Sequence, residues 1–299
     1  MSRTGSLPRD GTATLAVTHR AFTHHGRYSG YNRVLQELGV PVVDVHPDRT
    51  RARRVLEAWR VARGAAARGW QQVHLYPEQS LPFPGLAVDP QRTAVVVHQS
   101  PEMYLSHPRG RLFVRTLRRV GLVIALGQTQ RNWLSAQGVN AVFVPHGVDT
   151  AWFQPAAKAA GARARTFVTV PGWQRRPVVH DQVMELGGGR LDDQRYRDGL
   201  RGSAGLVLDL PQGVASNAVL EACACGLPVL GRLSTDTASY VAPENRRLLE
   251  LTLPDQLAAP PDELRRVGEA NRAYVAASFR WSDVGGRLRE VLAVGGDRC

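Results

Sequence analysis

Residues 206–241, LVLDLPQGVASNAVLEACACGLPVLGRLSTDTASYV, decide the fold of this chain. The apolar run 206–208 predicts a buried parallel strand. Ser216 or Asn217 can cap a helix that ends before Gly226, a residue suited to a left-handed C-cap. The apolar residues just after this glycine predict the next strand. A strand–helix–strand unit of this kind belongs to a doubly wound α/β sheet, in which ligands bind at the carboxyl ends of the strands.

The start of this predicted helix has the chemistry of an anion site. The loop before it is made of small residues, namely Gly213, Ala215, Ser216 and Ala218. Free amides and the positive end of the helix dipole point into such a loop, so it can hold a phosphate. Glu221, about one turn further along, can accept hydrogen bonds from a ribose diol. On spacing alone an equal alternative stays open, in which Ser216 only caps the helix and Glu221 is an exposed helical residue.

The same residues carry a family resemblance. The stretch ASNAVLEACACGLPVLG, followed later by ASYV, resembles the signature of retaining GT-B glycosyltransferases related to family 4. The resemblance implies an α/β fold of two Rossmann-like domains facing each other across a cleft. It also implies that Glu221 holds the donor ribose and that the pyrophosphate lies on Gly213, Ser216, Asn217 and Ala218. The family's first glutamate, eight positions before the second, falls on Gly213, so this chain has no acidic residue there.

Length and composition fit a globular protein of one or two domains. The chain has 299 residues, of which 43% are hydrophobic and 21% charged. The sequence has no apolar run long enough to span a membrane, and its first residues lack a signal-peptide core, so we expect a cytoplasmic protein. Of the three cysteines, Cys223 and Cys225 lie on different faces of one helix, which supports neither a disulfide nor a metal site.

The strong positive charge has several readings. The formal net charge of +12 is almost wholly arginine, since the one lysine is Lys158. The basic stretches lack interleaved aromatics and no recognition motif is present, so nucleic acid is not an expected partner. Anionic sugar nucleotides and an anionic membrane surface are the favoured ones. Residues 109–120 predict a basic amphipathic helix suited to peripheral membrane contact, although a solvated face is the commoner meaning of such a helix.

The N-terminal half begins with a predicted strand at residues 12–18 and a loop that contains Ser29 and Gly30. Gly30 allows close backbone approach, which a side chain would block. SGYNRVLQEL resembles the start of the family's acceptor domain, which implies that Gly30 approaches the donor phosphate and that Ser29 and Tyr31 lie on the acceptor side. On its own, one loop glycine also fits an ordinary turn. The histidines of this loop are expected to contact substrate; they are His19, His24 and His25.

His98 is the main candidate for contact with the transferred sugar. It directly follows a predicted strand at residues 94–97, which places it at the ligand edge of the sheet. It resembles the family histidine that reaches the donor sugar near the reacting carbon, so we expect a catalytic role for His98 together with Gly30. The alternative is a histidine satisfied by neighbouring backbone.

A second match sets the domain organisation. The stretch VPHGVDTAWFQP, residues 144–155, resembles the family's crossover between domains. We therefore expect an acceptor-side Rossmann-like domain at 1–155 and a nucleotide-sugar-binding domain at 156–275. Residues 276–299 are expected to form a C-terminal helix that packs back on the first domain. The second domain has too few residues for the family's usual set of strands and helices, so we expect it to lack about one strand–helix unit.

The cationic groups of the donor site also depart from the family. Arg175 and Arg176 stand near the family's phosphate-binding arginine, and no lysine is available beside them. We expect these arginines to hold the diphosphate, since a bidentate arginine binds phosphate well.

The expected activity is metal-independent transfer of a sugar, with retention, from a nucleoside-diphosphate sugar to an unidentified acceptor. No cofactor beyond that substrate and no metal is expected, because the sequence contains no Asp-x-Asp motif. The alternative is a catalytically impaired relative that acts as a nucleotide-sugar-binding or partner subunit. A nucleic-acid-binding protein is a weaker third reading, which rests on charge alone.

Overall fold

The computed structural model describes residues 13–19, 30–45, 50–80, 84–106, 108–156, 166–170, 180–186 and 193–296. Within these ranges the chain divides into two compact units. The first holds residues 13–19, 31–145 and 285–296, and the second holds Gly30 and residues 146–284, each with the gaps just given. None of the helices in these ranges combines the length and the apolar character that crossing a membrane requires.

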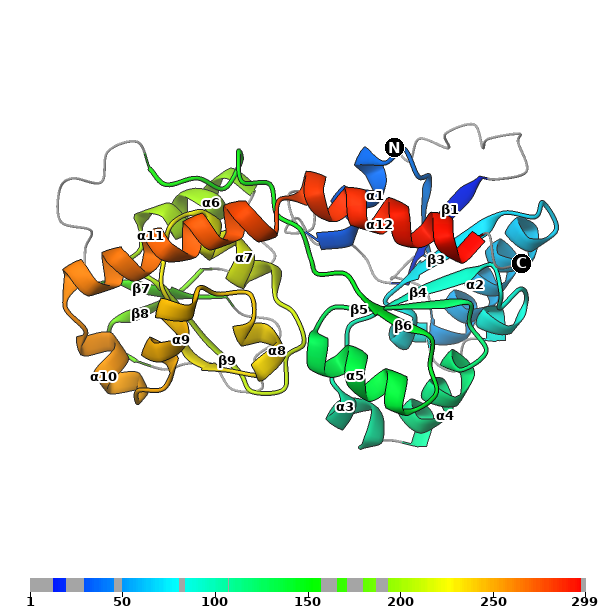
Figure 1. Cartoon of the computed structure of the whole chain (residues 1–299), viewed down its shortest axis with the longest axis horizontal. Helices are drawn as coiled ribbons and strands as arrows, with labels where there is room; N and C mark the ends of the chain where they lie inside the picture. Colours follow the sequence, from blue (N-terminus) through cyan, green and yellow to red (C-terminus); the bar gives the residue numbers. More distant parts are fainter. Residues whose placement is uncertain are drawn as a thin grey trace. The chain divides into compact units, whose positions relative to one another are not determined.

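Within the described residues, the first unit is built on a six-stranded parallel sheet in the order β2-β1-β3-β4-β5-β6 (Figure 1). Its strands are β1 (Thr14–Thr18), β2 (Val42–Asp44), β3 (Gln71–Leu75), β4 (Thr93–Val97), β5 (Leu122–Ala125) and β6 (Ala141–Phe143). Its helices are α1 (Gly30–Glu37), α2 (Arg51–Ala66), the 3-10 turns η2 (Pro77–Ser80) and η3 (Pro84–Ala87), α3 (Pro101–Leu105), α4 (Pro108–Leu117) and α5 (Gln128–Ala136).

The core of the first unit follows from continuous apolar strands. All five residues of β4 are buried, as expected for a strand covered on both faces by helices. Two leucines of this unit are exposed instead: Leu56 of α2 is 45% exposed and Leu112 of α4 is 53% exposed. The alanine face of α2, with Ala58 and Ala62, packs into the core instead.

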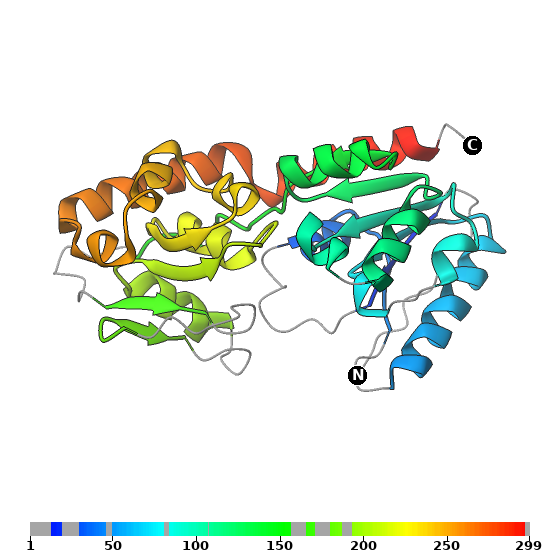
Figure 2. The ribbon, with the colours of Figure 1, turned by 90° about the horizontal axis from the view of Figure 1, so that it is seen from below.

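The second unit has a smaller sheet. Its four parallel strands within the described residues lie in the order β10-β9-β7-β8. They are β7 (Phe167–Thr169), β8 (Val183–Glu185), β9 (Leu206–Leu210) and β10 (Val229–Leu233). Its helices are α6 (Asp193–Gly202), α7 (Asn217–Ala224), α8 (Thr235–Ala238), α9 (Pro243–Leu249), α10 (Leu253–Ala258) and α11 (Pro261–Ser278). Figure 2 shows helices on both faces of each sheet.

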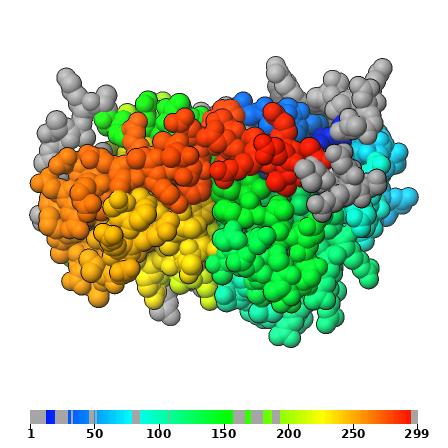
Figure 3. Space-filling view, in the orientation of Figure 1, coloured from blue at the N-terminus to red at the C-terminus, as the bar shows by residue number. Residues whose placement is uncertain are grey.

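The strand–helix–strand unit predicted at residues 206–230 is confirmed as β9, α7 and β10. Gly226 follows α7 with φ 73°, the left-handed conformation expected there. Helix α11 packs tightly against this point, because a Cβ on its Gly268 would lie 2.1 Å from the Gly226 carbonyl oxygen. Figure 3 shows the other face of α11, in orange, at the molecular surface.

The last helix, α12 (Trp281–Gly296), begins in the second unit and continues into the first from Gly285. Within the first unit, a Cβ on Gly285 would meet Val34 of α1 at 3.6 Å. The Gln71 side chain at the start of β3 donates a hydrogen bond of 3.1 Å to the carbonyl of Leu292. These contacts fix the second half of α12 on the first unit.

Candidate functional site

The start of α7 is accessible, whereas the rest of the helix is buried. Ser216, Asn217 and Ala218 are partly exposed, and residues 219–224 are buried. Ser216 is the N-cap, but its side chain makes no capping hydrogen bond with any residue that the structure describes. The leading amides of α7 are therefore not covered by the hydroxyl that usually satisfies them. Such a helix terminus can bind an anionic group.

Glu221 lies one turn further along α7 and is 1% exposed. The Tyr196 hydroxyl of α6 donates a hydrogen bond of 2.8 Å to its Oε2 atom. Burial, followed by the negative charge of Glu221, raises the pKa of Tyr196 well above its usual value, so this hydroxyl stays protonated and continues to donate. Glu221 is thus a buried carboxylate with a fixed orientation, and not an exposed helical residue.

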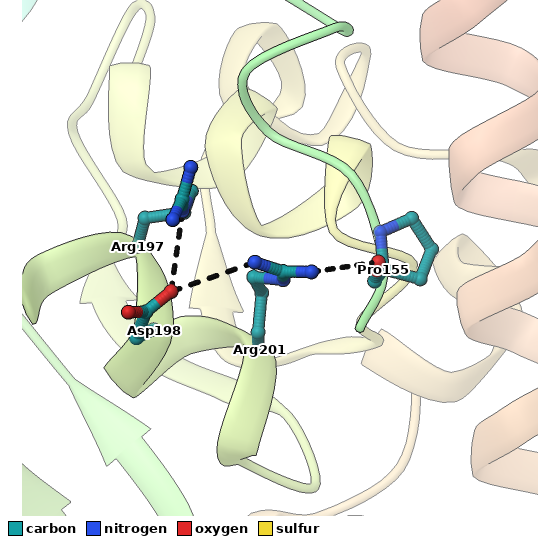
Figure 4. A network of polar contacts seen from close by, with 4 residues as sticks. All are labelled: Pro155, Arg197, Asp198 and Arg201. Atoms are coloured by element: carbon teal, nitrogen blue, oxygen red, sulfur yellow. Dashed lines mark hydrogen bonds and ion pairs between the residues drawn. The ribbon is translucent and has the colours of Figure 1, made fainter. Parts of the chain in front are cut away.

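The crossover segment after β6 supports this pair. The ring of Phe153 packs edge-on against Tyr196, with ring centroids 6.5 Å apart. Helix α6 contacts the same segment through Arg201, which donates a hydrogen bond of 3.2 Å to the Pro155 carbonyl (Figure 4). Arg197 and Arg201, both on α6, also form ion pairs with Asp198. These contacts tie α6 to the crossover segment and so help to fix the position of Tyr196.

Gly30 lies against the start of α7. It has φ 77°, and a Cβ at this position would lie 3.1 Å from Nδ2 of Asn217. Its amide donates a hydrogen bond of 2.9 Å to the Gly147 carbonyl, and all three residues belong to the second unit. Both the positive φ and the close approach favour glycine, because a side chain would be strained and would press on Asn217.

His146 is a residue of this cluster for which the sequence predicted no role. It is 4% exposed, and burial lowers its pKa to about 4, while a polar contact with the Asn217 side chain partly offsets that shift. The imidazole is therefore neutral at pH 7. Its position in the VPHGVD stretch was recognised as a family match, but nothing in the spacing indicates that the ring lies beside the start of α7.

Gly213 is packed against α8. A Cβ at Gly213 would lie 2.8 Å from Oγ1 of Thr237, and the Gly213 carbonyl accepts a hydrogen bond from the Ser234 hydroxyl. The same Ser234 hydroxyl caps α8 by accepting from the Thr237 amide at 3.0 Å. A side chain at position 213 would therefore press on the Thr237 hydroxyl.

His98 lies in the first unit, one residue beyond β4. Its ring stacks on that of Tyr76, with centroids 3.7 Å apart and planes 20° apart. Its backbone amide donates a hydrogen bond of 2.9 Å to Oε1 of Glu78. His98 is thus at the carboxyl end of the sheet, as its sequence position predicted.

Other predicted site residues have different placements. Tyr31 is 3% exposed, and its hydroxyl donates to the Val144 carbonyl at 2.6 Å. The structure brings Gly30, Gly213, Ser216, Asn217, Ala218 and Glu221 together in the second unit, and places Tyr31 and His98 in the first. Ser29, Arg175 and Arg176 lie outside the described residues. The roles assigned to all these residues stay predictions.

Sequence comparisons give no relative for this chain. No protein-family model matches it, and no curated protein matches it in sequence.

Solved structures do resemble it over nearly its whole length. Sucrose-phosphate synthase from Thermosynechococcus elongatus matches with a TM-score of 0.69 at 14% identity, covering 94% of this chain and 98% of that one. Anabaena HepE in complex with UDP-glucose matches with a TM-score of 0.65 at 13% identity, covering 94% and 99%. A glycosyltransferase from Rickettsia africae matches with a TM-score of 0.60 at 9% identity, covering 95% and 98%. The similarity confirms the expected GT-B fold, with its parallel α/β sheets.

Proposed function

We propose that this protein is a glycosyltransferase that moves a sugar from a nucleoside-diphosphate sugar to an acceptor. The observation that carries the proposal is the start of α7, where accessible amides without a side-chain cap precede the buried carboxylate of Glu221 by one turn. Amides at a helix start bind phosphate, and a carboxylate accepts hydrogen bonds from ribose hydroxyls. The GT-B fold, shared with a HepE structure that contains UDP-glucose, supports the proposal.

Each candidate residue has a role in this scheme. The ribose binds Glu221, whose other contact, with the Tyr196 hydroxyl, fixes the carboxylate. The diphosphate binds Gly213, Ser216, Asn217 and Ala218, and Arg175 and Arg176 neutralise part of its charge. Gly30 leaves room for the phosphates beside Asn217. His98 contacts the transferred sugar, while Ser29 and Tyr31 belong to the acceptor side.

The chemistry needs charge stabilisation more than it needs a strong base. The bond between the anomeric carbon and the diphosphate breaks, and the diphosphate leaves with the electron pair. A new bond forms from the acceptor hydroxyl oxygen to the same carbon, and the hydroxyl proton passes to an oxygen of the departing diphosphate, with retention and without a metal in the proposed reaction. Dipoles that already point at the departing phosphate lower the barrier, because they need no reorganisation as its charge develops.

Binding experiments with Glu221 variants test the donor site. A thermal-shift screen of UDP-, GDP-, ADP- and TDP-sugars first identifies the base, since a ligand that binds the folded state raises its stability. Calorimetry with the preferred nucleotide then compares wild type with Glu221→Gln. We expect the affinity to fall about tenfold to a hundredfold, because a hydrogen bond to a charged group contributes about 1.5–3 kcal/mol.

Two controls keep the result interpretable. The amide of Glu221→Gln still accepts from Tyr196, so circular dichroism and the melting temperature should stay close to wild type. Glu250→Gln removes an exposed carboxylate of the same unit and should leave the affinity unchanged. Equal affinity in wild type and a folded Glu221→Gln would refute the ribose role.

A second candidate function rests on Gly213. Because glycine stands where the resembled family has its first glutamate, and a Cβ there would press on Thr237, the donor sugar lacks one acidic contact. This feature favours a relative that binds nucleotide sugars without turning them over. Transfer of a labelled sugar, or its hydrolysis from the nucleotide, would support the enzyme; tight binding with neither would support the binding protein.

We also propose that α3 and α4 contact anionic membranes. Leu105 and Leu112 are 49% and 53% exposed, and the Arg111 side chain donates a hydrogen bond of 3.2 Å to the Leu105 carbonyl. Arg109 and Arg115 are exposed on the same helix. Apolar side chains among arginines suit the surface of an anionic bilayer.

The protein should sediment with phosphatidylserine vesicles but not with phosphatidylcholine vesicles, and Leu112→Asp should reduce the fraction that sediments. Equal sedimentation of wild type and Leu112→Asp would count against the contact.

A further inference from the structure

We propose that Glu78, acting with Tyr76 and Gln130, is a positioning residue that holds His98 in one orientation at the end of β4. The inference deepens the proposed function and rests on it. Glu78 and Gln130 bond the backbone around His98, and Tyr76 covers the ring.

The backbone on both sides of His98 is bonded by buried side chains. Oε1 of Glu78 accepts from the His98 amide at 2.9 Å. The Gln130 amide group donates to the Val97 carbonyl at 3.2 Å and to the Gln99 carbonyl at 2.8 Å. Gln130 is itself fully buried, and its Oε1 accepts from the Leu126 amide at 2.8 Å, which fixes which way the amide group faces. The peptide group that joins Val97 to His98 is therefore held at both its carbonyl and its amide, and the peptide group that follows Gln99 is held at its carbonyl.

The ring of His98 is held by a residue in a strained conformation. Tyr76 is the one residue other than glycine with a positive φ in the described part of the chain, at 55°. This conformation places the tyrosine ring parallel to the His98 ring at 3.7 Å. A bulky residue persists in this region only where its surroundings over-determine it, and such residues cluster at functional sites. The strain at Tyr76 therefore indicates that the stacked pair serves function.

Glu78 is an unusual choice for a purely structural contact. It is 8% exposed, and its Oε1 also accepts from the Tyr104 hydroxyl at 2.6 Å. Burial raises the pKa of Glu78, and the hydrogen bonds from Tyr104 and His98 oppose that shift. Burying a carboxylate is costly where a neutral acceptor could serve both the His98 amide and the Tyr104 hydroxyl. A demand for a fixed His98 accounts for that cost.

A positioning role and a structural role predict different measurements. If the network only stabilises the first unit, its loss lowers the melting temperature and leaves the His98 ring unchanged. If it positions His98, its loss changes the environment of the ring and slows transfer while the donor still binds, because the donor-binding residues belong to the second unit.

The experiment uses histidine-labelled full-length protein and NMR, with His98→Gln to identify the His98 signals. We expect Glu78→Leu and Tyr76→Gly to shift or split the His98 ring signals in the absence of any ligand. With substrate, turnover should fall tenfold or more, and the donor affinity should stay within about twofold. Glu78→Gln keeps an acceptor for the His98 amide, so it should recover wild-type-like ring signals and most of the lost turnover.

Controls separate the possible failures. Glu102→Leu removes an exposed carboxylate on α3 and should leave ring signals and turnover unchanged. If Glu78→Leu does not fold, Tyr76→Gly carries the test, since glycine adopts φ 55° without strain. Unchanged His98 signals in a folded Glu78→Leu or Tyr76→Gly would overturn the proposal. The ring signals need no substrate, so a wild type without transferase activity would refute the proposed function and leave this test of positioning intact.

Discussion

Gly213 decides how the loop before α7 packs. A Cβ at this position would lie 2.8 Å from the Thr237 hydroxyl, and Thr237 is fully buried. We predict that Gly213→Ala lowers the free energy of unfolding by about 1–3 kcal/mol, the usual cost of overpacking a well-packed site. Urea denaturation measures this change. Gly213→Glu, which places there the acidic residue of the resembled glycosyltransferases, should destabilise at least as much.

A double-mutant cycle with Thr237 identifies the cause. Thr237→Ala removes the hydroxyl that a new Cβ would meet, so Gly213→Ala should cost less in that background than in wild type. Gly286→Ala is the control, because nothing lies within 4 Å of a Cβ there. Additive losses from Gly213→Ala and Thr237→Ala would show that the clash is not the reason for glycine.

Single residues differed in how well the sequence predicted them. Gly226 was predictable because a left-handed C-cap leaves a local pattern of helix, glycine and proline. The burial of Glu221 was not predictable, because the sequence of a helix does not show whether this position faces solvent or a buried partner such as Tyr196. His146 and Tyr196 left no signal either, because their partners are distant in sequence. The chemistry of a site formed by long-range contacts therefore needs the structure.

At the scale of elements, apolar runs located β1, β4 and β9, and the amphipathic pattern of residues 109–120 located α4. Three short helices, α8, α9 and α10, were not predicted, because each is too short to show a repeated apolar pattern. Two of them, α9 and α10, provide hydrogen-bond partners for one edge of the sheet. β10 is an edge strand, and its outer backbone groups bond to side chains: Asn245 of α9 pairs with the Val229 amide and carbonyl, and Gln256 of α10 with those of Gly231.

These two amide side chains take the place of a further strand. Asn245 and Gln256 are 0% and 1% exposed, so they close the edge of β10 away from water. An unpaired sheet edge invites association with other chains, and covering it with a helix is one known remedy. The outward-facing backbone groups of Val229 and Gly231 are therefore bonded within the second unit. The sequence did not predict this device, because glutamine and asparagine on short helices look like ordinary surface residues.

At the scale of the whole molecule, buried neutral histidines make stability depend on pH. Burial lowers the pKa of His74 to about 3 and that of His146 to about 4. Burial, then the neighbouring His74, also lowers the pKa of His19. In the unfolded chain each would titrate near its ordinary value of about 6.5. Between that value and the folded one, the unfolded state binds more protons, so stability is complete above pH 6.5 and is lost as the pH falls toward 4.

The loss of stability at low pH should differ between the two units. His19 and His74 belong to the first unit and His146 to the second. Each histidine contributes a slope of about 1.4 kcal/mol per pH unit in this window. Glu78, whose pKa burial raises, acts in the opposite direction above its ordinary value, since its folded form holds a proton longer. The first unit should therefore lose stability faster than the second between pH 6.5 and 5, with Glu78 reducing the difference.

Denaturation in urea at pH 7.5, 6.5, 5.5 and 5.0 tests this prediction. Tryptophan fluorescence reports on the first unit through Trp70 and Trp133 and on the second through Trp152, which single-tryptophan variants can separate. His146→Gln removes the proton that this residue takes up on unfolding, so the second unit should lose less stability than in wild type as the pH falls. His180→Gln changes an exposed histidine of the same unit and should leave the slope as in wild type. A His146→Gln protein that keeps the wild-type pH dependence would mean that other groups govern acid unfolding.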